Sequence, residues 1–364
     1  MRNILGDKIT LTLFGESHGP YVGATLDGMI PGIEIDHEFI KTQLAKRRPC
    51  GKSETARVEL DEYEIISGVF NGYTTGAPIT VIIPNKNINS SDYEKMKNTP
   101  RPSHADYVMN VKYDGFNDYR GGGHTSGRVT TPIVVIGAIM LQVLKRHNIL
   151  VGTHILKCLD IEDVNFVDYE NEIKLLQNKN YPLINSLEEE LVSKLEKVAM
   201  EKDSVGGILQ TAVINLPIGL GDPWFSSVEG KISNALFSIG AVKGIEFGEG
   251  FNFVNLTGKK ANDEFTTNKD KIVTKTNHNG GINGGVTNGM PVVFNTVVKP
   301  TPSIGLPQTT VDLSTHSETT LTINGRHDPA IIRRIAVVID SIVAIVVVDL
   351  LSMRYGDNFM NFED

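Results

Sequence analysis

Cysteine is scarce in this sequence, which has only Cys50 and Cys158 among its 364 residues. The two lie far apart and lack the Cys-x-x-Cys spacing, which argues against a disulfide framework and against a structural zinc site. We therefore expect no metal centre and a chain that works in the reducing cytoplasm. The amino-terminal segment meets the charged Asp7 and Lys8 before any apolar stretch, so we expect no secretory signal.

Positive charge is in deficit, because 35 Lys and Arg stand against 43 Asp and Glu, a formal net charge of -8. Such a chain has no general attraction for nucleic acid or for an anionic membrane surface, and we expect neither as a partner. The longest apolar run, 335–351, is interrupted by Asp340 and Asp349 and is slightly short for a membrane span. We expect this run to be a buried helix.

Common catalytic signatures are absent. The sequence around Ser17 lacks the Gly-x-Ser-x-Gly spacing of a nucleophile elbow, which disfavours a serine hydrolase. No strand pattern precedes glycines 121–123 and no Gly-Lys-Ser/Thr follows them, so the dinucleotide and Walker A motifs both fail.

Four segments are predicted to be strands, the first by period-two alternation of apolar residues and the other three by β-favouring composition bounded by Gly, Pro or Asn. They cover residues 8–14, 77–85, 206–217 and 290–300. The first runs directly into Gly-Glu-Ser-His-Gly-Pro, so this polar cluster should lie at a strand end. Two amphipathic helices should follow capping boxes formed by Ser186 with Glu189 and by Ser226 with Glu229.

A third predicted helix starts with Thr131 as N-cap and Pro132 as its first residue, runs to 147 and is apolar nearly all round. It should form the core together with 335–351. Because strands and helices do not alternate regularly and no repeat is present, we predict a single α+β domain over residues 1–364. The charged span 160–185 is the nearest thing to a domain boundary, and it could as easily be a surface excursion.

Two histidines lie in turn-rich motifs. His18 lies beside Glu16 and Ser17, which could orient its ring, and His104 follows Arg101 by three residues. Histidine titrates near neutral pH and can donate or accept a proton. Taken alone, each motif is better explained as an ordinary hydrogen-bonded turn than as a catalytic site.

Residues 118–132 place three consecutive glycines beside Arg120, His124 and Arg128. Bare backbone can approach a ligand closely, and the helix that follows adds a positive dipole end. The stretch suits an anionic ligand, although a plain connector would read the same way. Further polar, turn-rich motifs that could join it in one cleft lie at 277–292, 299–303 and 325–340. Together they predict an enzyme that acts on a small, multiply anionic substrate, with or without a phosphorylated cofactor.

The chain carries, in this order, the motifs FGESHGP, RPSHADY, DYRGGGHTSGR, GAVKGIEFGEGF, NHNGGINGG, KPTPSI and GRHDP. Their order and approximate spacing, from about Phe14 to Leu351, resemble the chorismate synthase family. The resemblance implies a 1,4-anti elimination of phosphate from 5-enolpyruvylshikimate 3-phosphate to give chorismate, the last step of the shikimate pathway. It also implies a need for reduced FMN without net redox change, a β-α-β sandwich with long core helices between antiparallel sheets, and a homotetramer.

The resemblance further implies roles for individual residues. One of the two histidines would keep reduced flavin in its productive protonation state, the other would assist phosphate departure, and Asp328 would help the flavin take the substrate proton. The implied catalytic residues are Ser17, His18, His104, Ser126 and Asp328. The implied cofactor contacts are His124, Thr125, Ser126, Gly240, Ala241, Gly284, Lys299, Pro300, Thr301, Pro302, Ser303 and Arg326, with Arg47 linked to nicotinamide-nucleotide binding. The implied contacts to the substrate anions are Arg48, Arg101, Arg120 and Arg128.

The chain departs from the family pattern at two places that bear on cofactors. His124 stands where the family usually has Arg, which removes a permanent cation from the flavin loop, and Ser53 stands where Arg is common. The second change puts the nicotinamide contact in doubt, and no large insertion of the bifunctional kind is present. We expect an external flavin reductase, with NADPH as an indirect reductant. The alternative function is an FMN-binding reductase or a phospholigand-binding relative without lyase activity.

Overall fold

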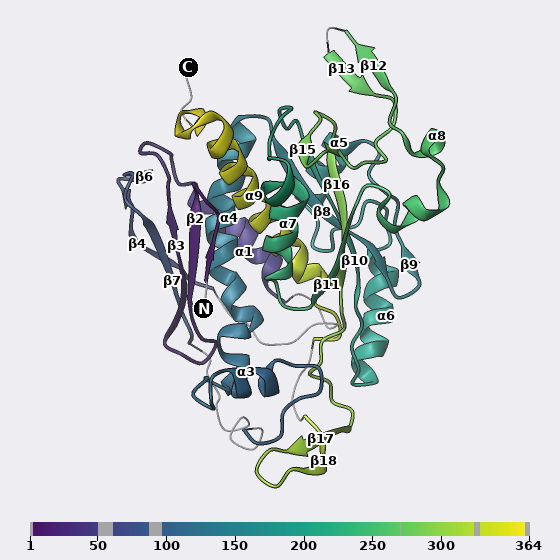
Figure 1. Cartoon of the computed structure of the whole chain (residues 1–364). Coiled ribbons are helices and arrows are strands. Elements are labelled where there is room, and N and C mark those ends of the chain that lie inside the picture. Colours follow the sequence, from purple (N-terminus) through teal and green to yellow (C-terminus); the bar gives the residue numbers. More distant parts are fainter. Residues whose placement is uncertain (1–2, 50–60, 87–96, 270, 324–327, 361–364) are drawn as a thin grey trace.

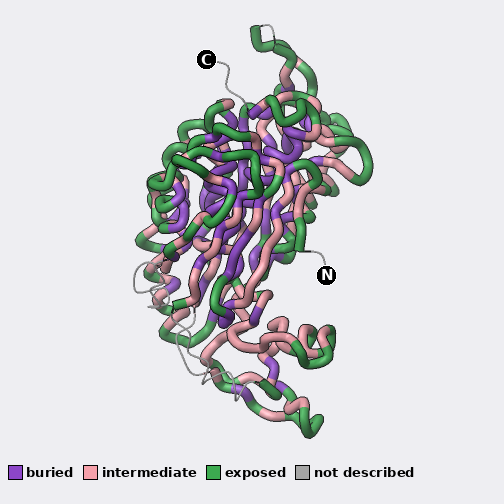
Figure 2. The backbone as a smooth tube through the Cα atoms, turned by 90° about the vertical axis from the view of Figure 1, so that its left-hand side faces the viewer, coloured by how far each residue is buried: buried purple, intermediate pink, exposed green. Residues whose placement is uncertain are grey.

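Two five-stranded antiparallel sheets enclose a layer of helices (Figure 1). The structure is a computed structural model that describes residues 3–49, 61–86, 97–269, 271–323 and 328–360. The β-α-β sandwich expected from the sequence is confirmed, as is the α+β class. In Figure 2, buried residues are concentrated between the sheets, whereas the segment that contains α3 and β17–β18 is mostly intermediate or exposed.

The first sheet has the strand order β1-β2-β3-β7-β4. Its strands are β1 (Ile4–Leu5), β2 (Thr10–Gly15), β3 (Tyr21–Asp27), β7 (Ile79–Pro84) and β4 (Glu64–Ser67). β7 alternates strictly, with Ile79, Val81 and Ile83 buried against the helices. The strands predicted at 8–14 and 77–85 are both confirmed, and the structure shows a period-two burial pattern in β7.

The second sheet has the strand order β11-β16-β10-β8-β9. Its strands are β11 (Val242–Phe247), β16 (Val292–Val298), β10 (Gly207–Ile214), β8 (Leu150–Cys158) and β9 (Ile161–Glu162). β10 and β16 confirm the strands predicted at 206–217 and 290–300. Both faces of this sheet are covered over β8 and β10, which explains why β10 is buried along nearly its whole length.

Two long helices, α4 (Thr130–Arg146) and α9 (Ile332–Tyr355), form the centre of the molecule. α4 packs on β3 and β7 of the first sheet, α9 packs on β8 and β10 of the second, and the two helices pack along each other. Both are long and apolar enough to cross a membrane, but 78% and 94% of their most apolar windows are buried inside the fold. They are core helices, as the sequence predicted, flanked by α1 (His37–Arg47) and α7 (Val228–Phe237).

The core helices meet at a glycine. A Cβ added to Gly137 of α4 would lie 2.2 Å from the Cβ and 2.5 Å from the Cα of Ser341 on α9. No side chain fits into that space, so the two helix backbones approach each other closely at this point. The Oγ of Ser341 turns away from the contact and donates to the carbonyl of Val337, 2.7 Å away.

The outer face of the second sheet is covered by the span 160–185. Its helix α5 (Tyr169–Leu176) packs on β8 and β10 through Ile173 and Leu176, which form a small second core with Phe166. The span is therefore a packed cover of the sheet. The remaining helices among the described residues are α3 (Asp106–Lys112), α6 (Glu188–Met200), α8 (Gly258–Ala261) and the short 3₁₀ segments η1 (Arg120–Thr125), η2 (Gly127–Val129), η3 (Trp224–Ser226), η4 (Gly250–Asn255) and η5 (Asp357–Met360).

Four two-stranded ribbons complete the described fold. They are β5–β6 (Val69–Phe70, Tyr73–Thr74), β12–β13 (Phe265–Asn268, Lys271–Thr274), β14–β15 (Ile282–Asn283, Val286–Thr287) and β17–β18 (Gln308–Asp312, Ser317–Leu321).

The predicted helix caps were wrong in detail. Ser227, not Ser226, caps α7 by accepting a hydrogen bond from the backbone N of Gly230. α6 starts after Leu187 without a side-chain cap, so Ser186 is not its N-cap. α4 already begins at Thr130, so Thr131 lies inside it, with its Oγ1 donating to the carbonyl of Arg128. In each case the observed N-cap lies one or two residues from the predicted one, a difference that local sequence patterns do not resolve.

Two buried carboxylates on α9 have opposite surroundings. Asp349 accepts hydrogen bonds from the backbone N of Asp7, Lys8 and Ile9 at 2.7–3.2 Å and pairs with Lys231. Asp340 has a buried Oδ1 without a hydrogen-bond partner among the described residues. Burial raises the pKa of Asp340 to about 6, against the opposing effects of a hydrogen bond from Thr153 and the charge of Lys46.

We predict that Gly137→Ala lowers the free energy of unfolding by about 1–3 kcal/mol, because the added methyl group forces the core helices apart. Alanine's higher helix propensity, worth about 1 kcal/mol, acts in the opposite direction and should not compensate. Urea unfolding monitored by circular dichroism measures the change. The control is Gly258→Ala in α8, where an added Cβ meets no atom within 4 Å; equal effects of the two variants would contradict the close helix approach.

We predict that Asp340→Asn is more stable than the parent protein at pH 8 and nearly equal to it at pH 4. The folded-state pKa of Asp340 is raised, so its ionisation costs stability as the pH rises from about 4 through about 6, and the neutral amide avoids that cost. The shift corresponds to a gain of up to about 3 kcal/mol. Urea unfolding at the two pH values measures it, with Asp349→Asn as the matched variant that should instead lose stability at pH 8. A destabilised Asp340→Asn at pH 8 would refute the assignment.

Candidate active site

The turn after β2 and the glycine-rich turn η1 face each other. The backbone N of Ser17 donates to the carbonyl of Gly123 (3.1 Å), and the Ser17 hydroxyl lies 3.1 Å both from the carbonyl of Arg120 and from Nδ1 of His18. Because the hydroxyl donates its single hydrogen to the carbonyl, its oxygen is left to accept from Nδ1 of His18. The ring of His18 is thus held with its proton on Nδ1 and is 6% exposed.

The consecutive glycines of η1 lie against the two candidate histidines. A Cβ added to Gly121 would lie 2.3 Å from Cε1 of His18, and a Cβ added to Gly122 would lie 3.1 Å from Cε1 of His104. Both glycines have positive φ, as does Gly123. Glycine is therefore required here both for the backbone conformation and for the space that the imidazole rings take up. The loop brings together two histidines that are 86 positions apart in the sequence (104 − 18).

His124 anchors the same loop to the first sheet. Its Nδ1 lies 2.7 Å from the carbonyl of Gly15, the last residue of β2, and a carbonyl can only accept, so the ring donates. Thr125 donates to the carbonyl of Gly122, and the hydroxyl of Ser126 caps η2 by accepting from the backbone N of Arg128. His124, at the position where the family usually has Arg, thus has a defined hydrogen-bond partner at the end of β2.

His104 is held by two charged neighbours. Its Nδ1 lies 2.6 Å from Oδ1 of Asp106. The carboxylate of Asp106 also accepts two hydrogen bonds from Arg101, from Nε to Oδ2 (2.7 Å) and from Nη2 to Oδ1 (2.8 Å). Burial alone would raise the pKa of Asp106, but the hydrogen bonds and charges of Arg101 and His104 hold it well below its usual range. Asp106 was not singled out from the sequence, although it lies only two residues beyond His104 in the same motif.

A second cluster joins Arg47 and Arg128 through Asp61. Both guanidinium groups pair with Asp61, whose side chain is 1% exposed, and Arg47 also donates to the carbonyl of Gly127 (2.7 Å). Nε of Arg128 donates to Oδ1 of Asn85 (2.9 Å), whose amide nitrogen donates to the carbonyls that frame the His18 turn. These buried pairs fix the loop after the glycines onto the end of β7. Asp61 and Asn85 carry no local sequence signal, because their partners are far away along the chain.

The other two candidate substrate arginines differ in setting. Arg120 is paired through Nε and Nη2 with Asp118 and its side chain is 38% exposed, which leaves Nη1 outside that pair. Arg48 follows α1, and its carbonyl accepts from the buried Arg333. Arg333 also donates to the carbonyl of Lys46 (2.9 Å), so it caps the last turn of α1.

The segment 299–303 lies beside the histidine motif. Nζ of Lys299 donates to the carbonyl of Ser103 (2.7 Å), and the hydroxyl of Ser303 accepts from Nη1 of Arg101 (3.0 Å). Thr301 donates to the carbonyl of Asp328, whose carboxylate pairs with Arg334 at 2.6 Å. The structure therefore brings 299–303 and Asp328 to the same end of the fold as the histidines.

Two further flavin candidates lie next to this segment. The carbonyl of Ala241 accepts from the backbone N of Lys299 (2.9 Å), and the space around Gly240 is open, with no atom within 4 Å of an added Cβ. Burial and the nearby charge of Lys243 lower the pKa of Lys299. Lys299 thus lies within the electrostatic influence of Lys243, and its backbone N donates to the residue that follows Gly240.

Gly284 is the one described candidate that the structure does not bring to this end. It lies in the β14–β15 turn, where the next residue, Gly285, accepts a hydrogen bond from the first residue of α7. The β14–β15 turn precedes the start of β16, and Lys299 follows the end of β16. A strand of seven residues is roughly 20 Å long, so its two ends are separated by about that distance. Arg326 lies outside the described residues, as does Ser53.

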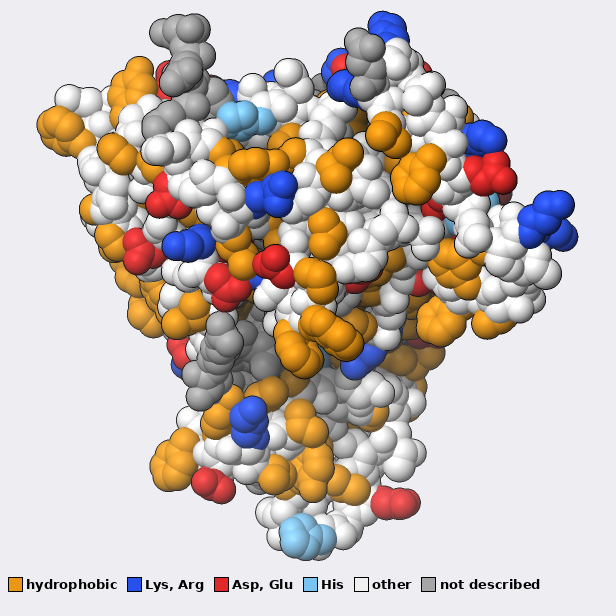
Figure 3. All heavy atoms as spheres, turned by 45° about the horizontal axis from the view of Figure 1, so that its top comes forward, with side chains coloured by type: hydrophobic (Ala, Val, Ile, Leu, Met, Phe, Trp, Pro, Cys, Tyr) orange, Lys and Arg blue, Asp and Glu red, His pale blue; other side chains and the backbone are white. Residues whose placement is uncertain are grey.

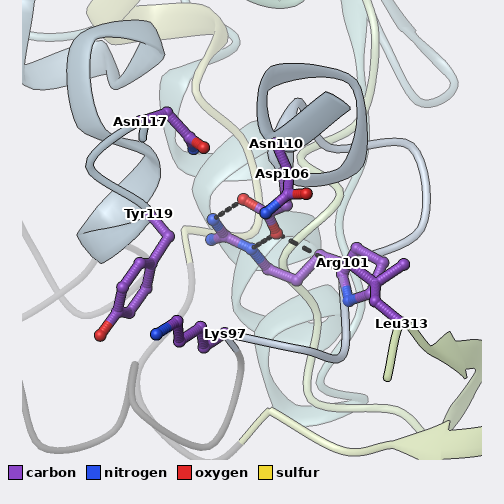
Figure 4. Close-up of a pocket in the computed structure, with 8 residues that line it drawn as sticks. Lys97, Arg101, Asp106, Asn110, Asn117, Tyr119 and Leu313 are labelled. Carbon is purple, nitrogen blue, oxygen red and sulfur yellow. Dashed lines mark hydrogen bonds and ion pairs between the residues drawn. The ribbon is translucent and has the colours of Figure 1, made fainter. Parts of the chain in front are cut away.

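The Arg101–Asp106 pair also borders a polar pocket with an empty volume of about 350 Å³. Figure 4 shows the pair in its centre, with Asn110 and Asn117 on one side and with the ammonium of Lys97 near the ring of Tyr119. Among the described residues, no group of three or more His, Cys, Asp or Glu side chains is arranged to hold a metal ion.

Comparison with known proteins gives one consistent result. The family described as chorismate synthase matches residues 9–352. A chorismate synthase of Thermococcus kodakarensis is 44% identical over 350 residues, which cover 96% of this chain and 97% of that protein. One of Dehalococcoides mccartyi is 43% identical, with 98% of both chains covered. A solved structure titled "Crystal Structure of Chorismate Synthase" superimposes with a TM-score of 0.77 at 25% identity and covers 98% of this chain and 95% of that one.

We predict that Asp61→Asn lowers the free energy of unfolding by about 3–5 kcal/mol, because it leaves two buried guanidinium groups without their carboxylate. The neighbouring Glu62→Gln is the control, since Glu62 pairs with Lys86 at the surface, where both side chains are more than half exposed. That pair should contribute less than about 1 kcal/mol. Urea unfolding of both variants measures the contrast, and similar effects would contradict a structural role for Asp61.

Proposed function

The chain belongs to the chorismate synthase family, and from that premise we propose that the cleft around His18, His104 and the glycine turn η1 is its active site. The enzymes of this family are carbon–oxygen lyases. They convert 5-enolpyruvylshikimate 3-phosphate to chorismate by 1,4-anti elimination of phosphate, the last common step toward the aromatic amino acids. The observation that carries the proposal is the pair of glycines, Gly121 and Gly122, each packed against one imidazole ring.

We propose reduced FMN as the cofactor. Reduced flavin, when bound, can lend an electron as phosphate leaves and recover it afterward, which explains a redox cofactor in a redox-neutral reaction. The residues present fit such a group. Lys299 provides a cation for a phosphate within the electrostatic influence of Lys243, and Gly240 provides open backbone near it. The proposed flavin contacts are His124, Thr125, Ser126, Gly240, Ala241, Lys299, Pro300, Thr301, Pro302, Ser303 and Arg326.

The protein's own residues supply binding and proton transfer. Arg120, with Nη1 directed outside its pair with Asp118, is the arginine best placed to meet a substrate anion, with Arg48, Arg101 and Arg128 around it. His18 and His104 hold and move protons at Nε2, because Nδ1 of each ring is occupied by Ser17 or Asp106. Asp328, oriented by Arg334, is the proposed partner for the substrate proton, and Ser17 and Ser126 hold the turns.

We propose that an external flavin reductase, with NADPH as its electron source, keeps the flavin reduced. Arg47, the residue linked to nicotinamide-nucleotide binding, is 5% exposed and donates to Asp61, Gly127 and Thr130. Its guanidinium is thus occupied inside the protein. This occupation supports an outside source of reducing equivalents.

We also propose a homotetramer, formed by a single-domain chain in the cytoplasm. Hydrophobic side chains are exposed at the end of the molecule that Figure 3 shows, and large apolar side chains of η3 and η4 are highly exposed. They are Trp224 at 87%, Phe225 at 99%, Phe251 at 81% and Val254 at 84% exposure. Such a concentration is unusual for a surface that faces only water. Gly284 lies near η3, away from the proposed flavin site of its own chain. It could therefore contribute only to the flavin site of a second copy of the chain in the tetramer.

We predict that the purified protein, with chemically reduced FMN and 5-enolpyruvylshikimate 3-phosphate in the absence of oxygen, releases phosphate and forms chorismate. His18→Ala and His104→Ala should each lower turnover by about 10–10⁴-fold, because each removes a proton-transfer group. His37→Ala, which changes an exposed histidine at the start of α1, is the matched control and should leave the rate unchanged.

Binding of FMN without turnover would favour the alternative, an FMN-binding reductase or a phospholigand-binding relative. An unchanged rate in either active-site variant would remove that histidine from the mechanism. Loss of activity in air, compared with and without NADPH and an added flavin reductase, tests the external source of reduced flavin.

A further inference from the structure

Asp106 contacts Nδ1 of the His104 ring, whereas the glycine turn lies beside Cε1 and Nε2. It is the first residue of α3, 15% exposed, and its Oδ1 lies 2.6 Å from Nδ1 of His104. On the other side of the ring, an added Cβ at Gly122 would lie 3.1 Å from Cε1 and 3.5 Å from Nε2 of His104. The imidazole therefore has a carboxylate on one nitrogen and the glycine turn beside the other.

This geometry selects one tautomer. Nη2 of Arg101 also approaches Nδ1 of His104, at 3.1 Å. If Nδ1 accepted from Arg101, its lone pair would face a carboxylate oxygen only 2.6 Å away, which is repulsive. With the proton on Nδ1, the short contact becomes an N–H···O hydrogen bond to Asp106, and the lone pair is left on Nε2, toward the glycine turn.

Asp106 is itself firmly held. Its Oδ2 accepts from Nε of Arg101 (2.7 Å) and from the backbone N of Arg101 (3.1 Å), and its Oδ1 accepts from Nη2 (2.8 Å). Nη1 of the same guanidinium donates to Ser303. Lys299, through its bond to the carbonyl of Ser103, is the next cation in this neighbourhood. The pairing with Arg101 keeps the pKa of Asp106 low in spite of its burial, so the carboxylate stays ionised across the neutral range.

We propose that Asp106 is a positioning residue that fixes the ring of His104 with its proton on Nδ1 and its reactive Nε2 toward the glycine turn. Arg101 holds Asp106 in turn, in addition to any contact with the substrate. An ionised carboxylate also stabilises the imidazolium that forms when Nε2 takes up a proton, which suits either proton-transfer role. The inference rests on the proposed function of His104, and the tautomer itself can be measured independently of catalysis.

The test is Asp106→Asn. An amide at this position accepts from Arg101 through its oxygen and turns its NH₂ toward Nδ1, which forces the ring proton onto Nε2. We expect kcat under anaerobic conditions with reduced FMN to fall by about 10²–10⁴-fold, with a much smaller change in KM. Asp106→Glu, which keeps the charge, should recover part of the loss, and Asp160→Asn, which breaks the exposed pair with Lys194, should leave kcat unchanged.

A double variant separates positioning from a general structural effect. In the His104→Ala background, the further change Asp106→Asn should cause no additional loss, because the ring that it orients is gone. An equal loss in both backgrounds, or an unchanged kcat in Asp106→Asn alone, would overturn the proposal.

The parent protein provides a measurement that does not depend on the folding of any variant. Nitrogen-15 spectra, with the His104 ring signals assigned by their disappearance in His104→Ala, should show the Nδ1-protonated tautomer. Protonation on Nε2 in the neutral ring would refute the positioning role. If the parent protein showed this tautomer but no turnover, the proposed function would fail while the geometric assignment stood.

Discussion

The contact between Gly137 and Ser341 sets the thickness of the molecule. Because no side chain separates α4 from α9 there, each long helix can lie against its own sheet while touching the other helix. Both helices also begin at the same end of the fold, where α4 emerges from the glycine turn and α9 from the segment that holds Asp328. A wider spacing would move these two starts apart and, with them, the candidate catalytic groups.

Buried guanidinium groups hold the chain in place where regular secondary structure ends. Arg47 and Arg128 share Asp61, Arg101 is clamped to Asp106, and Arg333 caps the last turn of α1. Each guanidinium group donates several hydrogen bonds at once, so it can hold irregular loops that have no regular backbone hydrogen bonds of their own. Arg101 and Arg128, which the family resemblance assigns to substrate anions, therefore also hold the loops around the cleft, so substitution of either residue affects both roles.

The elements that could be predicted are those whose burial follows a simple period. β7 and β16 alternate in burial, β2 alternates Leu with Thr, β10 is a β-favouring stretch bounded by Gly and Pro, and the two core helices are apolar nearly all round, so their existence and type followed from the sequence. The starts of α4, α6 and α7 did not, because α7 is capped by the neighbouring Ser227 and the other two helices begin without a side-chain cap. The motifs around His18 and His104 pointed to the site, but their partners Asp61, Asn85 and Asp106 did not stand out. Two of these meet their arginines only through long-range folding, and the third looks like an ordinary helix start.

The bond between Asp349 and the backbone of residues 7–9 joins parts of the chain that are about 340 positions apart. The loop that leads into β2 is therefore secured only when α9 is present, about 340 residues further along the chain. Loop closure over such a distance adds little to the equilibrium cost, since that cost grows only with the logarithm of length, but it orders events in time. α9 also begins beside the segment that holds Asp328, so a fragment that ends before α9 should lack both this bond and a complete cleft.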